Sequence, residues 1–188
     1  ILRHNVAEMK KREAKTVVTS CPACWLVWAK LYPEWCEKLG IDYAFETKHY
    51  SELLADSIQR GDLKFTEEVP MRVTWHDSCH MGRAGGIYEP PREVIRAIPG
   101  VDFVEVEHNR QNGLCCGSVL TLIGEPPVAH LIGDHRLQEA VDVNAEAMLA
   151  CCPCCQFQLR VSADRMGTNM PIYDLAWFAA KALGITDI

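Results

Sequence analysis

The hydrophobic residues of this chain fall into short segments with two different periodicities. Apolar and β-branched runs at 16–20, 71–75 and 148–150 are typical of buried strands. The alternating apolar and acidic residues of 101–106 predict a strand with one buried face. Helical stretches are predicted at 5–15, 25–31, 51–60, 91–97, 127–147 and 172–183. Strands that alternate with helices in this way predict an α/β fold.

Two parts of the chain repeat one pattern. At 16–28 and again at 148–159, a strand leads into Cys-Pro-x-Cys and then into a helix, with the two copies 131 positions apart. Each copy is followed by a helix of similar lettering, at 49–55 and at 172–177. The repetition indicates a duplicated module. Because only 20 residues precede the first Cys-Pro-x-Cys, we expect the front half of the first module to be absent from this chain.

Composition narrows the class of protein. The chain has 188 residues, of which 48% are hydrophobic and 23% are charged, as expected for one folded domain or two small ones. Its apolar runs, such as 175–180, are too short for a transmembrane helix, and no signal peptide is visible. The net charge of −6 argues against nucleic acid as a partner.

Cysteine is the informative residue type. Ten cysteines stand at 21, 24, 36, 79, 115, 116, 151, 152, 154 and 155. A chain of this size does not need disulfide bonds to be stable, and adjacent cysteines suit a metal cluster better than a set of disulfides. We therefore expect metal ligands or redox groups in a reducing, cytoplasmic compartment.

The spacing of five cysteines predicts one site. They follow the pattern C-x35-CC-x35-C-x2-C and are Cys79, Cys115, Cys116, Cys152 and Cys155. Five thiolates exceed the four that zinc or a cubane cluster requires, which favours an unusual iron–sulfur centre, with zinc or inert thiols as alternatives. The repeat aligns Cys21 and Cys24 with Cys152 and Cys155, so Cys151 and Cys154 are expected to be bystanders, and Cys36 a buried free thiol.

Several motifs together resemble a known family. They are His76-Asp77-Ser78-Cys79-His80-x-Gly82-Arg83, Gly86-x-Tyr88-x-x-Pro91-Arg92, Cys115-Cys116-Gly117 and Cys152-Pro153-x-Cys155. They resemble the cysteine-rich CCG domain found in the B-type and D-type polypeptides of heterodisulfide reductase and in related iron–sulfur oxidoreductases. The resemblance implies tandem CCG modules, each a small sheet with flanking helices, related by pseudo-twofold symmetry. Residues 1–70 would be the C-terminal part of a first module, and 71–188 a complete second one.

The resemblance also implies a cofactor and a function. The five cysteines would hold a noncubane [4Fe-4S] cluster, and Cys21 and Cys24 would be two ligands of a second site. The chain would be a subunit that reduces a disulfide substrate, with ferredoxin-like, flavin or membrane electron-transfer subunits as partners and membrane association only through them. An electron-relay subunit and a zinc-stabilised module are the alternatives. Relatives often have a glycine-rich stretch after CCG, whereas this chain has 118–122, Ser-Val-Leu-Thr-Leu.

Three residues near the first cysteine of the pattern are candidates for catalysis. His76 and His80 flank Cys79 and could supply protons or donate hydrogen bonds to cluster sulfur, which would tune its potential. Histidines at the end of a strand are also often structural hydrogen-bond partners. Arg83 could bind an anionic group of the substrate.

Overall fold

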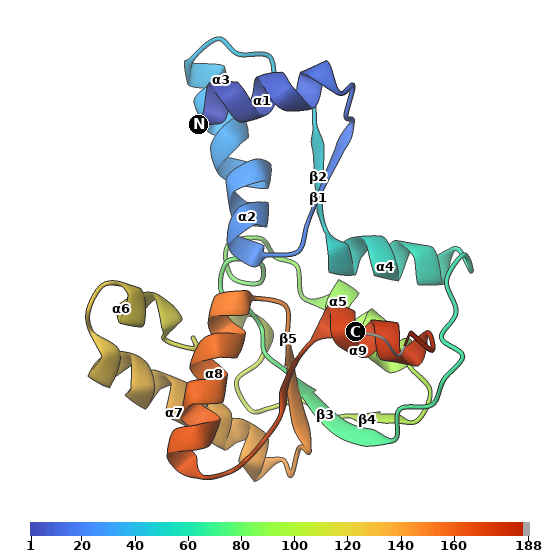
Figure 1. The fold of residues 1–188 in the computed structure, drawn as a ribbon, viewed down its shortest axis with the longest axis vertical. Helices are drawn as coiled ribbons and strands as arrows, with labels where there is room; N and C mark the ends of the chain where they lie inside the picture. Colours follow the sequence, from blue (N-terminus) through green and yellow to red (C-terminus); the bar gives the residue numbers. More distant parts are fainter. Residues whose placement is uncertain (186–188) are drawn as a thin grey trace.

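A computed structural model describes residues 1–185, and of Leu122 only the backbone. Residues 186–188 of the predicted second module lie outside the described residues. The larger part of the molecule is built on one parallel sheet (Figure 1). In spatial order its strands are β4 (Val101–Phe103), β3 (Met71–Trp75), β5 (Ala147–Ala150) and β6 (Ile172–Asp174). The α/β class predicted from the sequence is confirmed.

Helices cover both faces of this sheet. On one face lie α5 (Glu89–Ala97) and α9 (Leu175–Ala182), and on the other α7 (Pro126–Asp142) and α8 (Pro153–Met166) (Figure 1). Side chains along β5 alternate between the two layers: Leu149 packs with the α5 and α9 side, and Met148 with the α7 and α8 side. A strand that is buried on both faces explains the continuous apolar run of this segment.

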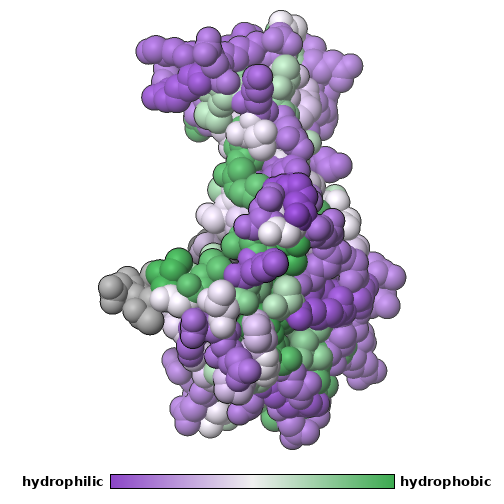
Figure 2. All heavy atoms as spheres, turned by 90° about the vertical axis from the view of Figure 1, so that its right-hand side faces the viewer, coloured by the Kyte–Doolittle hydropathy of each residue, from purple (hydrophilic) through white to green (hydrophobic). Residues whose placement is uncertain are grey.

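The first 60 residues form a thinner part. Strands β1 (Thr16–Thr19) and β2 (Glu46–His49) make a two-stranded parallel sheet. Beside it lie the helical segments α1 (Leu2–Lys11), α2 (Pro22–Leu26), η1 (Val27–Leu31) and α3 (Tyr32–Lys38), and α4 (Tyr50–Gln59) follows β2. Cys36 is fully buried in the small core of this part, as predicted. Figure 2 shows the narrow connection between the two parts.

Apolar packing and a hydrogen bond join the two parts. The ring of Trp25 lies against the backbone of Gly85, where an added Cβ would approach the ring to 2.6 Å and the Met81 carbonyl oxygen to 2.4 Å. Glycine is thus required for close approach rather than for a turn alone. The Tyr50 hydroxyl donates a hydrogen bond of 3.1 Å to Asp174. Trp25, Met81 and Cys151 belong to one continuous core that spans both parts.

Strand pairing extends the predicted repeat. Thr19 pairs with His49, and Ala150 pairs with Asp174. His49 and Asp174 each cap the following helix by accepting a hydrogen bond from the backbone N–H two residues further on. His49 is therefore equivalent to Asp174. The sequence comparison of 49–55 with 172–177 aligned His49 with Ile172, so the structure shifts this alignment by two residues.

Several elements differ in type or bounds from those predicted. β6 replaces the start of the helix predicted at 172–183, because residues 172–174 pair with the buried strand β5. β2 was not predicted, since its sequence is polar and half-exposed. α7 ends at Asp142 and β4 at Phe103, both short of the predicted bounds, and α1 spans Leu2–Lys11 rather than 5–15. Gly184 has φ of 75° after α9, as predicted for a residue that ends a helix.

His49 predicts a pH dependence of stability. Burial lowers its pKa to about 4 from 6.5. The unfolded chain therefore binds a proton that the folded chain does not between these two pH values. The free energy of unfolding is therefore unaffected by this titration above pH 6.5. It decreases, by about 3 kcal/mol at most, as pH falls from 6.5 toward 4. Urea unfolding between pH 7 and 4 should show a smaller loss of stability in His49→Asn, which can still cap α4. Equal pH profiles for the two proteins would contradict this expectation.

Candidate metal centre

The cysteines of the predicted pattern gather at the carboxyl-terminal edge of the parallel sheet. Cys79 follows β3, Cys152 follows β5, and Cys155 lies in the first turn of α8. Cys115 and Cys116 come from the loop that precedes α6 (Ser118–Leu122). This edge is where open α/β sheets generally place their functional groups.

Contacts between the sulfur atoms link all five residues. The Sγ atoms of Cys116 and Cys155 lie 3.1 Å apart, although all ten cysteines are free thiols. Cys115 contacts both Cys79 and Cys116, and Cys152 contacts Cys155. Cys116, Cys152 and Cys155 are buried, while Cys79 and Cys115 are half-buried. Sulfur atoms this close without a bond between them are a donor set for soft metal ions.

The local environment divides these thiols into two classes. Hydrogen bonding from Cys116 and Cys79 lowers the pKa of Cys115, and the backbone N–H of Gly117 adds to this effect. Contact with Cys155, together with backbone N–H groups at the start of α8, lowers the pKa of Cys152. The thiols of Cys79, Cys116 and Cys155 have raised pKa values because they serve as the protonated partners. Cys115 and Cys152 are thus the thiols of this set that lose a proton most readily, and the thiolate is the form that ligates a metal.

Gly117 allows the two adjacent cysteines to face the sheet edge. Its φ is +83°, and a Cβ there would approach the Ala129 carbonyl oxygen to 2.6 Å. The chain therefore turns tightly against α7, and the Cys116 sulfur comes within 3.4 Å of the Ser118 hydroxyl. The short helix α6 begins directly after Gly117, and the sequence did not predict it.

His76 is placed against the sulfur atoms. One of its ring nitrogens and the Sγ atoms of Cys116 and Cys155 lie within 4.8 Å of one another. Burial, followed by the charge of Arg136, lowers the pKa of His76 to about 3. His76 is therefore neutral at physiological pH, which favours the predicted hydrogen-bonding role over that of a proton donor.

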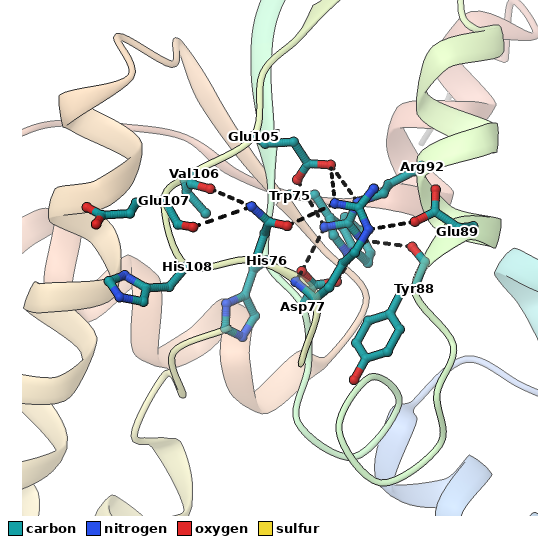
Figure 3. A network of polar contacts seen from close by, with 12 residues as sticks. Trp75, His76, Asp77, Tyr88, Glu89, Arg92, Glu105, Val106, Glu107 and His108 are labelled. Carbon is teal, nitrogen blue, oxygen red and sulfur yellow. Dashed lines mark hydrogen bonds and ion pairs between the residues drawn. The ribbon is translucent and has the colours of Figure 1, made fainter. Parts of the chain in front are cut away.

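A buried ion-pair network fixes the loop that carries Cys79 (Figure 3). Arg92 is fully buried and donates two hydrogen bonds of 2.8 Å to the carboxylate of Asp77. It also bonds to Glu105, and Asp77 accepts further bonds from the Trp75 indole and the Arg110 backbone. Burial alone would raise the pKa of Asp77, but Arg92 holds it below its usual value. The motif residues Asp77 and Arg92 thus have a structural role that the sequence did not assign.

The other two candidates for catalysis lie at the margin of the site. His80 is half-buried and helps to lower the pKa of Cys152. Arg83 is exposed and donates a hydrogen bond of 2.8 Å to the carbonyl oxygen of Gly113. Both residues therefore face the loops around the thiol cluster, and their roles stay predictions.

Cys21 and Cys24 approach this cluster from the thinner part of the molecule. α2 and α8 begin close to each other at the junction of the two parts (Figure 1). After burial and Cys21, the charge of Cys152 also raises the pKa of Cys24. Cys154 is exposed, and both Cys152 and Cys21 affect its pKa. The two cysteine groups thus face one another across the junction, while Cys151 is buried beside Met81.

Two features near the cluster escaped the sequence analysis. The first is Arg136, which is fully buried although its helix reads as polar. The second is an apolar cavity of about 290 Å³ beside the Cys-Pro-x-Cys turn, lined by Ser118, Thr121, Pro153, Cys154 and Phe157. The cavity comes from the packing of α6 on α8, which no local sequence pattern indicates.

The chain is similar to one family of cysteine-rich domains and to polypeptides of several oxidoreductases. The description "CCG: Cysteine-rich domain" matches residues 1–27 and 73–160. The chain is 34% identical over 99% of its length to the D-type polypeptide of dihydromethanophenazine:CoB–CoM heterodisulfide reductase from Methanosarcina barkeri. It is 35% identical over 81% of its length to the B-type polypeptide of the CoM/CoB fumarate reductase from Methanothermobacter marburgensis. It is 28% identical over 97% of its length to the EtfAB:quinone oxidoreductase of Syntrophomonas wolfei.

The chain spans only part of each of these proteins. It covers 45% of the heterodisulfide reductase polypeptide, 29% of the fumarate reductase polypeptide and 26% of the quinone oxidoreductase. Among the described residues, no helix combines the length and the hydrophobicity needed to cross a membrane.

Proposed function

The chain belongs to the CCG family of cysteine-rich domains, and we propose that it is the iron–sulfur subunit of a heterodisulfide reductase-like complex that reduces a disulfide substrate. The proposal is supported by the convergence of five thiols at one sheet edge, with the Sγ atoms of Cys116 and Cys155 3.1 Å apart. Such a dense and buried sulfur donor set fits iron–sulfur ligation better than a structural zinc site, which uses four ligands.

The cluster ligands would be the five cysteines of the predicted pattern: Cys79, Cys115, Cys116, Cys152 and Cys155. When bound, a noncubane [4Fe-4S] group would supply single electrons and sites where iron can bind substrate sulfur. The surrounding residues would act on this group: Asp77 and Arg92 would hold the Cys79 loop, Gly117 would turn the adjacent cysteines inward, and His80 would lie beside Cys152.

We further propose that residues 1–70 and 71–188 belong to two consecutive modules. The equivalence of His49 and Asp174 and the repeated Cys-Pro-x-Cys turns support this division. Cys21 and Cys24 would then be two ligands of a second site, completed by chain outside this sequence. Electrons would come from a ferredoxin-like, flavin or membrane subunit, and any attachment of this cytoplasmic protein to a membrane would be through such partners.

An electron-relay function is the second candidate, favoured by the similarity to a quinone oxidoreductase. A relay would carry electrons between partners without binding a disulfide. In that case a paramagnetic signal should depend on the applied potential alone.

Metal analysis and EPR test these proposals on the full-length protein purified without oxygen. We expect about four irons and matching acid-labile sulfide per complete module. A signal that appears when the CoB–CoM heterodisulfide or the corresponding thiols are added supports catalysis, whereas a response to potential alone supports the relay. Zinc without iron would refute both.

A further inference from the structure

The buried guanidinium of Arg136 is placed to control the hydrogen bonding of His76. Its Nε donates a hydrogen bond of 3.1 Å to His76 Nδ1. Its two Nη atoms donate to the carbonyl oxygens of His108 and Trp75, at 2.7 and 3.2 Å. Arg136 is 0% exposed and His76 is 1% exposed. All of the bonds to this guanidinium are made inside the protein, so its position is fixed from three sides.

These contacts determine which nitrogen of His76 carries the proton. A guanidinium has donors only, so His76 Nδ1 must act as the acceptor. The single proton of the neutral ring is then on Nε2. Because Nδ1 is occupied by Arg136, Nε2 is the nitrogen left to face the thiols of Cys116 and Cys155, whose sulfur atoms lie within 4.8 Å of a ring nitrogen.

We infer that Arg136 is a positioning residue, which fixes the tautomer of His76 so that an Nε2–H donor is directed at the sulfur atoms of Cys116 and Cys155. The inference rests on the proposed iron–sulfur function. Hydrogen bonds to cluster sulfur stabilise the reduced, more negative state and raise the reduction potential. The arginine charge itself is balanced by Glu139, whose carboxylate accepts a hydrogen bond of 2.6 Å from Arg136. The effect on the potential therefore passes mainly through His76.

A redox titration followed by EPR tests this on the anaerobically purified full-length protein. In Arg136→Met, His76 can take up the other tautomer, and we expect the ratio of reduced to oxidised cluster at a fixed potential to fall about tenfold, a shift of about 59 mV to more negative values for one electron. His76→Leu should give a shift in the same direction. Arg136→Lys retains a donor and a charge, so we expect it to restore part of the difference.

The double variant separates positioning from simple charge. If Arg136 acts through His76, Arg136→Met should change the potential much less in the His76→Leu background than alone. An equal shift in both backgrounds would mean that Arg136 acts by its charge and would overturn the inference. Arg160→Met is the control and should leave the potential unchanged, since Arg160 donates its hydrogen bonds to the carbonyl oxygen of Ile172 and makes none to His76.

ENDOR and ¹⁵N NMR spectra report directly which nitrogen of His76 carries the proton. If Arg136→Met does not take up iron, ENDOR on the wild-type protein should still detect an exchangeable proton coupled to the cluster that His76→Leu lacks; its presence unchanged in His76→Leu would refute the inference. If the wild type holds zinc, the proposed function fails. The ¹⁵N NMR spectrum of that diamagnetic protein should nevertheless show His76 protonated on Nε2, and a proton on Nδ1 would refute the inference alone.

Discussion

Replacing Cys155 with serine is expected to remove most of the iron from the protein. Cys155 is buried, and its Sγ lies 3.1 Å from that of Cys116, so serine would replace a central sulfur donor by a much poorer ligand for iron. Loss of a residue that only hydrogen-bonds to a metal ligand typically costs about 10- to 100-fold in metal affinity, so loss of a ligand should cost more than about 100-fold. If the proposed disulfide reduction takes place at this centre, its rate should fall by at least the same factor.

The neighbouring Cys154→Ser is the matched control. Cys154 lies on the same turn of α8, but it is exposed and no contact joins it to Cys116. Iron and sulfide analysis of the two anaerobically purified variants makes the comparison, and circular dichroism checks that both are folded. Normal iron content in Cys155→Ser, or equal loss in both variants, would contradict the proposed ligand set.

Asp77→Ala is expected to have the largest effect on stability. The substitution leaves the fully buried Arg92 without its bidentate partner and also removes the acceptor of the Trp75 indole and the Arg110 amide (Figure 3). Breaking a buried ion pair by removing one partner costs about 3–5 kcal/mol, because a buried charge loses its compensation. Glu105 still pairs with Arg92, so we expect the lower end of this range.

Denaturant unfolding of the metal-free proteins measures this effect. Asp102→Ala is the control, since Asp102 pairs with Arg72 at the surface, where an ion pair contributes less than about 1 kcal/mol. Asp77→Asn retains one acceptor oxygen and should be less destabilised than Asp77→Ala. A loss below about 1 kcal/mol in Asp77→Ala would show that the network does not hold the Cys79 loop.

The strands and the ligand pattern follow from local sequence. The segment 71–75 is predicted with the bounds that the structure shows, because a short run with β-branched and aromatic residues that follows a proline favours a strand. Pro22 and Pro153 each open a helix, as the two Cys-Pro-x-Cys turns predict. The polar strand β2 was missed because its pairing with β1, rather than its own composition, makes it a strand.

The sequence by itself determined the α/β class, the repeated Cys-Pro-x-Cys turns and the five cysteines of the candidate centre, because spacing and local propensity are properties of neighbouring residues. Only the tertiary structure decided how these cysteines meet, with Cys116 and Cys155 in contact across 39 positions of chain. It also decided that Arg136 is buried against His76, 60 positions away. A charged residue on a polar helix reads as solvated until the packing of α7 against the sheet shows which of its faces is covered.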